Sequence, residues 1–208
     1  MANRSDSYSL PPVVQQVATA FRLVGWISFW TQVVLGVVSG VVLIFAAGSF
    51  GAAAPQTTTI GPGGVPTTVP TGGAVNPGTG AGLFLAVLGL LALFGGAYWA
   101  FRYTRLSRKL RAARPEERLK RGDAIRALRL GLLINLAGML LTILGAQAIV
   151  GSLVAKSFAQ GVGIFTGNFQ RFINPLDIFL VQANTNTIMG HFVGLLATLW
   201  ILRSVNRQ

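Results

Sequence analysis

Long, mainly apolar segments occur four times along the chain, separated by polar or glycine-rich stretches. Residues 23–50 and 130–155 carry no charge at all, and ~20 apolar residues are enough to cross a hydrocarbon core of ~30 Å. The predicted transmembrane helices are 24–48, 82–101, 130–155 and 175–203. We therefore expect an all-α fold, a polytopic four-transmembrane-helix bundle that forms one membrane domain over 1–205.

A shorter amphipathic stretch, residues 10–24, precedes the first predicted span. Its apolar residues recur at helical spacing, while Gln15, Gln16, Thr19 and Arg22 face the other way. The pattern indicates a helix in the headgroup region, and docking of a partner is the alternative. The following apolar run also resembles a signal peptide, since residues 52–54 are small, but it is far longer than an h-region of ~7–15 residues.

Two uncharged or nearly uncharged segments are predicted to be loops on the outer side. Residues 51–81 contain eight Gly, seven Thr and five Pro with no charge, which predicts a flexible loop. Residues 156–174 are rich in Gly and Phe and predict an irregular link near the interface. Asn174, Pro175 and Asp177 then offer N-cap, N1 and N3 chemistry for the fourth helix.

The connector 102–129 holds 11 of the 17 Lys and Arg residues, whereas loop 51–81 holds none. This asymmetry predicts that both termini and the connector lie on the cytoplasmic side. The same rule accounts for the net charge of +12 without nucleic acid binding. The connector also predicts a basic surface for anionic lipid, made of Arg105, Arg108, Lys109, Arg111, Arg118, Lys120 and Arg121.

The chain offers little catalytic chemistry. It has no Cys, one His and five acids, three of which lie in the connector. There is no metalloprotease spacing, no phosphate loop and no pair of acids within a predicted span. We therefore expect a protein that is not an enzyme and that binds no cofactor tightly.

Small and polar residues recur at steps of three and four in the predicted spans. In the third span one face carries Gly, Asn, Thr and Ser almost throughout, and Ser28, Gln32 and Gly36 share a face in the first. Small residues let membrane helices approach closely. The predicted packing residues are Gly131, Gly138, Thr142, Gly145, Gly36, Gly40, Gly190 and Gly194.

His191 is the only histidine and falls within an apolar span. An ionisable side chain there is a functional candidate, including as a metal ligand. The alternative is a neutral imidazole that hydrogen-bonds to Asn135 or Gln147. The candidate residues for a transport path are His191, Asn184, Asn186, Gln182, Gln147 and Asn135. Lys156 is expected to extend to the outer headgroups, and Asp177 to act first as a capping partner.

Four strings resemble one known family, the chloroplast "permease in chloroplasts" proteins, which are also described as small subunits of the inner-envelope protein translocon and have cyanobacterial homologues. They are RLSRKLR (105–111), LGAQAIVGSLVAK (144–156), DIFLVQANTNTIMGHFVGLL (177–196) and LRSV (202–205). The resemblance spans roughly 21–205. It implies a four-helix inner-membrane protein, with iron permeation and a translocon role as rival descriptions.

Two functions follow as expectations. One is a permease or channel-like transporter for a metal ion such as iron, since iron(II) accepts imidazole and oxygen ligands. The other is a noncatalytic subunit or assembly factor of a membrane protein complex, and either implies homo-oligomers or membrane protein partners within the lipid bilayer. Because no Ser/Arg-rich transit peptide precedes Phe21, we expect a cyanobacterial-type member in the plasma or thylakoid membrane.

Overall fold

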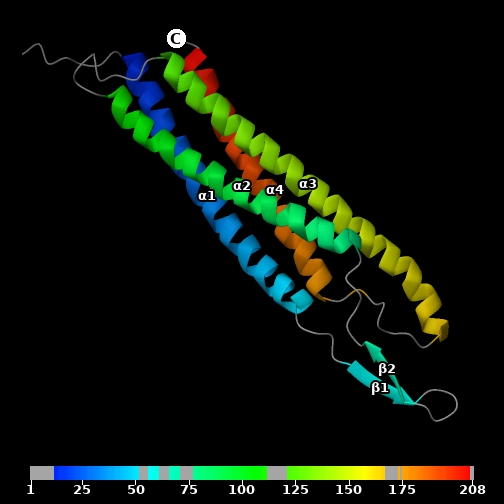
Figure 1. Ribbon diagram of the computed structural model, residues 1–208. Coiled ribbons are helices and arrows are strands. Elements are labelled where there is room, and N and C mark those ends of the chain that lie inside the picture. The colour runs from blue at the N-terminus through cyan, green and yellow to red at the C-terminus, as the bar shows by residue number, and fades with distance from the viewer. Residues whose placement is uncertain are drawn as a thin grey trace, which may run out of the picture.

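The computed structural model describes residues 12–51, 56–60, 66–70, 77–111, 121–166, 173 and 175–206. These residues form four long helices and one small hairpin, as Figure 1 shows. The elements are α1 (Pro12–Gly51), β1 (Gln56–Ile60), β2 (Pro66–Pro70), α2 (Pro77–Leu110), α3 (Arg121–Thr166) and α4 (Pro175–Asn206). The predicted four-helix membrane fold is confirmed, because each helix contains a segment apolar and long enough to span a bilayer.

The helices are longer than the spans predicted for them. The predicted amphipathic stretch and the first span form one continuous helix, α1, which begins at Pro12, a residue suited to a first turn. Helix α3 continues to Thr166, through much of the segment predicted as a loop from 156 onward. Isolated glycines such as Gly161 do not stop a helix, since each costs only ~1 kcal/mol relative to alanine.

The segment predicted as a flexible loop, 51–81, contains a two-stranded antiparallel hairpin. Strands β1 and β2 pair with Gln56 opposite Pro70 and Ile60 opposite Pro66. Threonine is β-branched and favours extended backbone, and Thr57, Thr58 and Thr59 form most of β1. Residues 52–55, 61–65 and 71–76 of this loop lie outside the described residues.

The four helices pack as a ring in which sequence neighbours touch and α1 also packs against α4. A smaller contact between α2 and α4 crosses the centre of the bundle. The start of α1, the end of α2, the start of α3 and the end of α4 lie together at one end (Figure 1). We call it the basic end, and the opposite end, near β1 and β2, the hairpin end.

Two apolar clusters fill the interior. The cluster at the basic end contains Phe21, Tyr103, Leu128 and Ile201. The cluster at the hairpin end contains Leu43, Leu93, Ile149 and Leu180. Each helix contributes to both clusters, so the residues that lie between them in each helix form a separate central layer.

Candidate functional site

The central layer between the two apolar clusters is polar. It contains the side chains of Gln32 from α1, Asn135 from α3 and His191 from α4, all of them buried. Ser28 lies one turn before Gln32 on α1 and accepts a hydrogen bond of 2.8 Å from Gln32 Nε2. Because burial of amides without hydrogen bonds is costly, the contacts in this layer decide whether it is stable.

His191 is 0% exposed and has a neighbour at each ring nitrogen. Its Nδ1 lies 3.2 Å from Asn135 Oδ1, and its Nε2 lies 3.1 Å from the carbonyl oxygen of Gly89 on α2. Both neighbouring atoms are acceptors, whereas a neutral imidazole carries a single N–H donor. The layer therefore has more acceptors than donors around His191.

A second acceptor in the layer has no donor. Gln32 Oε1 is buried without a hydrogen-bond partner among the described residues. Asn135 Nδ2 donates to the carbonyl oxygen of Gly131 at 3.0 Å, so this amide group already has an acceptor within its own helix. The central layer thus favours a group that brings protons or positive charge to its oxygens.

Glycines on α2 and α4 make room for the two amide side chains. A Cβ atom at Gly96 would lie 2.6 Å from Asn135 Oδ1 and 2.7 Å from Gln32 Oε1. A Cβ atom at Gly194 would lie 2.5 Å from Asn135 Oδ1 and 2.7 Å from Gln32 Nε2. No larger residue fits at either position without moving the amides, so the layer depends on both glycines.

The predicted packing residues lie where helices approach one another. Gly138 faces the His191 ring and Ala92, and a Cβ at Gly145 would lie 3.0 Å from the Gly82 carbonyl oxygen. The other contacts are Gly131 with Tyr103 and Trp99, Thr142 with Gly89, Gly36 with Phe94, Gly40 with Leu90, and Gly190 with Leu93. Small residues thus occupy contacts between helices inside this one chain.

The candidate path residues do not form one group. His191 and Asn135 meet in the central layer. Asn184 is buried nearer the hairpin end, where its Oδ1 has no partner among the described residues. Gln182, Asn186 and Gln147 are not buried: Gln182 and Gln147 are exposed, and Asn186 is half-buried. Of the two partners considered for His191, the structure therefore places Asn135 beside it and Gln147 on the outside of α3.

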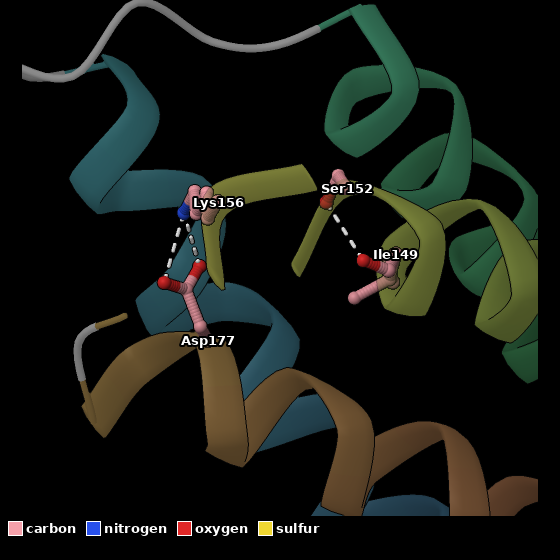
Figure 2. A network of polar contacts seen from close by, with 4 residues as sticks. All are labelled: Ile149, Ser152, Lys156 and Asp177. Atoms are coloured by element: carbon pink, nitrogen blue, oxygen red, sulfur yellow. Dashed lines mark hydrogen bonds and ion pairs between the residues drawn. The ribbon is translucent and has the colours of Figure 1, made fainter. Parts of the chain in front are cut away.

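Lys156 lies differently from the prediction that it extends to the headgroups. Figure 2 shows its Nζ between both carboxylate oxygens of Asp177, each at 2.8 Å. This contact forms because α3 continues past Lys156 and carries it alongside the first turn of α4. Asp177 is only 6% exposed, so the ion pair links α3 to α4 in a partly desolvated place.

Among the described residues, no three His, Cys, Asp or Glu side chains come together in a way that could hold a metal ion. A tight site around His191 would therefore need oxygen ligands from amides or backbone carbonyls. Two residues of the predicted basic surface, Arg118 and Lys120, lie outside the described residues.

The sequence reasoning missed Gln32 and the Gly89 carbonyl as parts of the site. Gln32 gave a signal, since it is an amide in an uncharged run on the same face as Ser28 and Gly36. Gly89 gave none, because every residue carries a backbone carbonyl and only the fold selects the one that faces His191.

Comparison with known proteins gives two results. A family model described as "Protein of unknown function (DUF3611)" matches residues 11–206. "Protein TIC 21, chloroplastic" from Arabidopsis thaliana is 34% identical over 211 aligned residues, which cover 98% of this chain and 63% of that protein. This chain thus spans less than two thirds of its curated relative. No solved structure matches the chain.

These matches confirm the relationship to a chloroplast protein that the sequence strings indicated. The family match covers all four described helices, including each of their candidate membrane-spanning segments. The chain therefore belongs to the DUF3611 family, as a membrane protein with four transmembrane helices.

Proposed function

We propose that this protein is a noncatalytic subunit of a membrane protein complex. The observation that carries the proposal is a polar patch on the outer surface of α4, formed by Gln182, Thr185 and Asn186. Gln182 Nε2 donates to Asn186 Oδ1 at 3.0 Å, and Thr185 Oγ1 donates to the Val181 carbonyl oxygen at 3.0 Å. Gln182 and Thr185 are exposed, and Asn186 is half-buried.

The patch lies within the candidate membrane-spanning segment Pro175–Asn206 of α4. With a helical rise of ~1.5 Å per residue, Asn186 is ~13 Å along α4 from Asp177, whose ion pair marks the hairpin end. Further along the same helix the exposed residues Phe192, Leu196 and Trp200 are apolar, as lipid contact requires. The polar patch is therefore a local exception on an apolar surface.

An amide in hydrocarbon is costly unless its donors and acceptors are used. Each amide has two N–H donors and a carbonyl acceptor, so the single bond between Gln182 and Asn186 uses only part of their capacity. A helix from another protein that offers hydroxyl or amide groups would use the rest, at ~0.6–2 kcal/mol per contact. The translocon description implied by the sequence resemblance belongs to the same class of function.

Copurification in mild detergent tests this proposal. We expect the wild-type protein to retain partner proteins in fixed stoichiometry and the Gln182→Leu/Asn186→Leu variant to lose them. Gln147→Leu is the control, since it removes an exposed amide from α3 instead of α4. Recovery of the wild-type protein as a pure homo-oligomer, with no partner, would contradict the proposal.

A second candidate function is permeation of a metal ion such as iron, and the central layer favours it. The layer has a buried imidazole and a buried Gln32 Oε1 without a partner among the described residues, and iron(II) accepts both types of ligand. Because His191 is 0% exposed inside the bundle, an ion reaches it only if helices separate.

Uptake of radioactive iron into proteoliposomes tests the second candidate. We expect His191→Ala to slow uptake strongly, whereas Ser157→Ala, which changes an exposed residue that is not a path candidate, leaves the rate unchanged. Equal rates for wild type and His191→Ala would remove His191 from the mechanism. No uptake by either protein would reject iron permeation and leave the subunit proposal in place.

A further inference from the structure

A pocket opens between α1 and α2 near the basic end of the bundle. Its volume is about 490 Å³, and its lining consists of Arg22, Trp26, Thr104, Ser107, Arg108 and Arg111. It is separate from the central layer, whose side chains do not line it. Neither the polar patch on α4 nor the proposed subunit function accounts for this pocket.

Three arginines converge on the pocket, and no carboxylate lies among its described lining residues. Arg111 is held in place because its Nη2 donates to Thr19 Oγ1 on α1 at 2.9 Å. The Thr104 and Ser107 hydroxyls donate to backbone carbonyls at 2.7 and 2.6 Å, so the guanidinium groups are the main free donors to a ligand. Like charges that line one pocket repel one another, and a bound anion would stabilise them.

An aromatic surface adjoins the charged pocket. Trp26 stacks on Trp30 with ring centroids 6.0 Å apart and contacts Phe29 and Phe101 edge-on at 5.6 and 6.2 Å. Trp26 is 37% and Trp30 is 55% exposed, so part of this surface faces outward. On α1, Trp26 and Trp30 lie four and eight residues after Arg22, within the candidate membrane-spanning segment Gln15–Phe45.

We propose that this pocket binds the phosphate headgroup of an anionic membrane lipid, with the acyl chain along Trp26 and Trp30. Arginine pairs well with phosphate oxygens, and tryptophan is enriched at the level of lipid headgroups. A soluble phosphate would use only the arginines and leave the adjoining aromatic surface uncovered. The combination of three cations with an exposed aromatic run is what selects a lipid.

Tryptophan quenching by lipids with brominated acyl chains tests the proposal on the unaltered protein. We expect brominated phosphatidylglycerol, diluted into phosphatidylcholine, to quench fluorescence more than brominated phosphatidylcholine at the same fraction. The excess quenching should disappear in Trp26→Phe/Trp30→Phe, which leaves Trp99 and Trp200 in place. Equal quenching by the two lipids would overturn the proposal.

Charge variants show whether the pocket itself is responsible. In Arg22→Gln/Arg108→Gln we expect the preference for phosphatidylglycerol to fall about fivefold for each arginine removed. Arg126→Gln/Arg129→Gln, which removes two exposed charges from α3, should keep most of the preference. An equal loss in both variants would mean that general attraction to the basic end causes it, and the proposal would be wrong. Both variants are first checked for wild-type melting in phosphatidylcholine.

Inorganic phosphate separates the lipid from a soluble anion. If the acyl chain contributes, millimolar phosphate should leave the phosphatidylglycerol-dependent quenching unchanged. Displacement of the lipid by free phosphate at that concentration would show that the arginines take a soluble anion, and would contradict the lipid assignment.

Discussion

Gly138 and Gly151 lie on the same helix, α3, in opposite surroundings. A Cβ at Gly138 would meet the His191 ring, at 2.6 Å from Nε2, and would lie 2.7 Å from Ala92 Cβ. A Cβ at Gly151 would meet nothing within 4 Å. The two glycines therefore separate the cost of crowding a contact from the intrinsic preference of a helix for alanine.

We expect Gly138→Ala to lower the free energy of unfolding by ~1–3 kcal/mol, because the His191 ring and Ala92 must move. Gly151→Ala should raise it by up to ~1 kcal/mol, since alanine is the better helix former and the position is open. Unfolding of the purified protein in mixed detergent micelles measures both. Equal and small effects of the two changes would contradict the close approach at Gly138.

Removal of the His191 side chain should destabilise the bundle through an unpaired acceptor. In His191→Ala, the one acceptor that receives the imidazole N–H, either Asn135 Oδ1 or the Gly89 carbonyl oxygen, loses its donor, at a cost of ~1–3 kcal/mol. His191→Gln keeps a donor and should restore part of the loss in the same unfolding measurement. Equal stability of His191→Gln and His191→Ala would contradict a stabilising role for the N–H donor.

At the scale of the helices, the sequence predicts the existence of each helix better than its bounds. Helix α4 begins at Pro175, as the capping pattern predicts, because proline suits a first turn. Helices α1 and α3 extend beyond their predicted spans, because no proline interrupts 13–51 or 121–166 and single charges such as Arg22 and Lys156 do not stop a helix. The hydropathy pattern identifies only the apolar segment that crosses the bilayer. It does not show how far the helix continues into water.

The partners in the central layer could be predicted only in part. His191 and Asn135 stand out as polar residues in apolar spans, and the structure brings them together. The sequence pattern does not predict which helices pack against each other, since small-residue faces occur on all four spans and could pack against any neighbour. The exposed position of Gln147 follows from the ring order of the helices, which only the folded structure gives.

The ion pair between Lys156 and Asp177 joins two helices across a predicted loop. Lys156→Ala should lower the free energy of unfolding by ~1.5–3 kcal/mol, because it removes charge-assisted hydrogen bonds to a carboxylate that is only 6% exposed. Arg129→Ala, an exposed charge on the same helix, is the control and should have a small effect. A double-mutant cycle with Asp177→Ala measures the coupling, and additive losses would show that the pair contributes nothing.

At the scale of the whole molecule, the four helices form a closed ring, and α2 and α4 also make a smaller contact across its centre. Helix α1 packs against both α2 and α4, and α3 does the same. The first and last helices therefore contribute to one cluster at the basic end, where Val17 and Phe21 lie in the same group as Ile201 and Val205. Helices α1 and α2 pack against each other, as do α3 and α4, and further contacts join these two helix pairs.

Because α4 packs against α1 and closes the ring, we expect the same arrangement of helices to form when their order along the chain is changed. A circular permutant that joins the end of α4 to the start of α1 by a flexible linker, and begins instead within residues 112–120 of the connector, should form the same four contacts between neighbouring helices. Its helix content and its melting temperature in detergent, compared with the parent protein, measure this. A permutant that inserts but melts without cooperativity would show that the order of synthesis, and not the packing alone, builds the bundle.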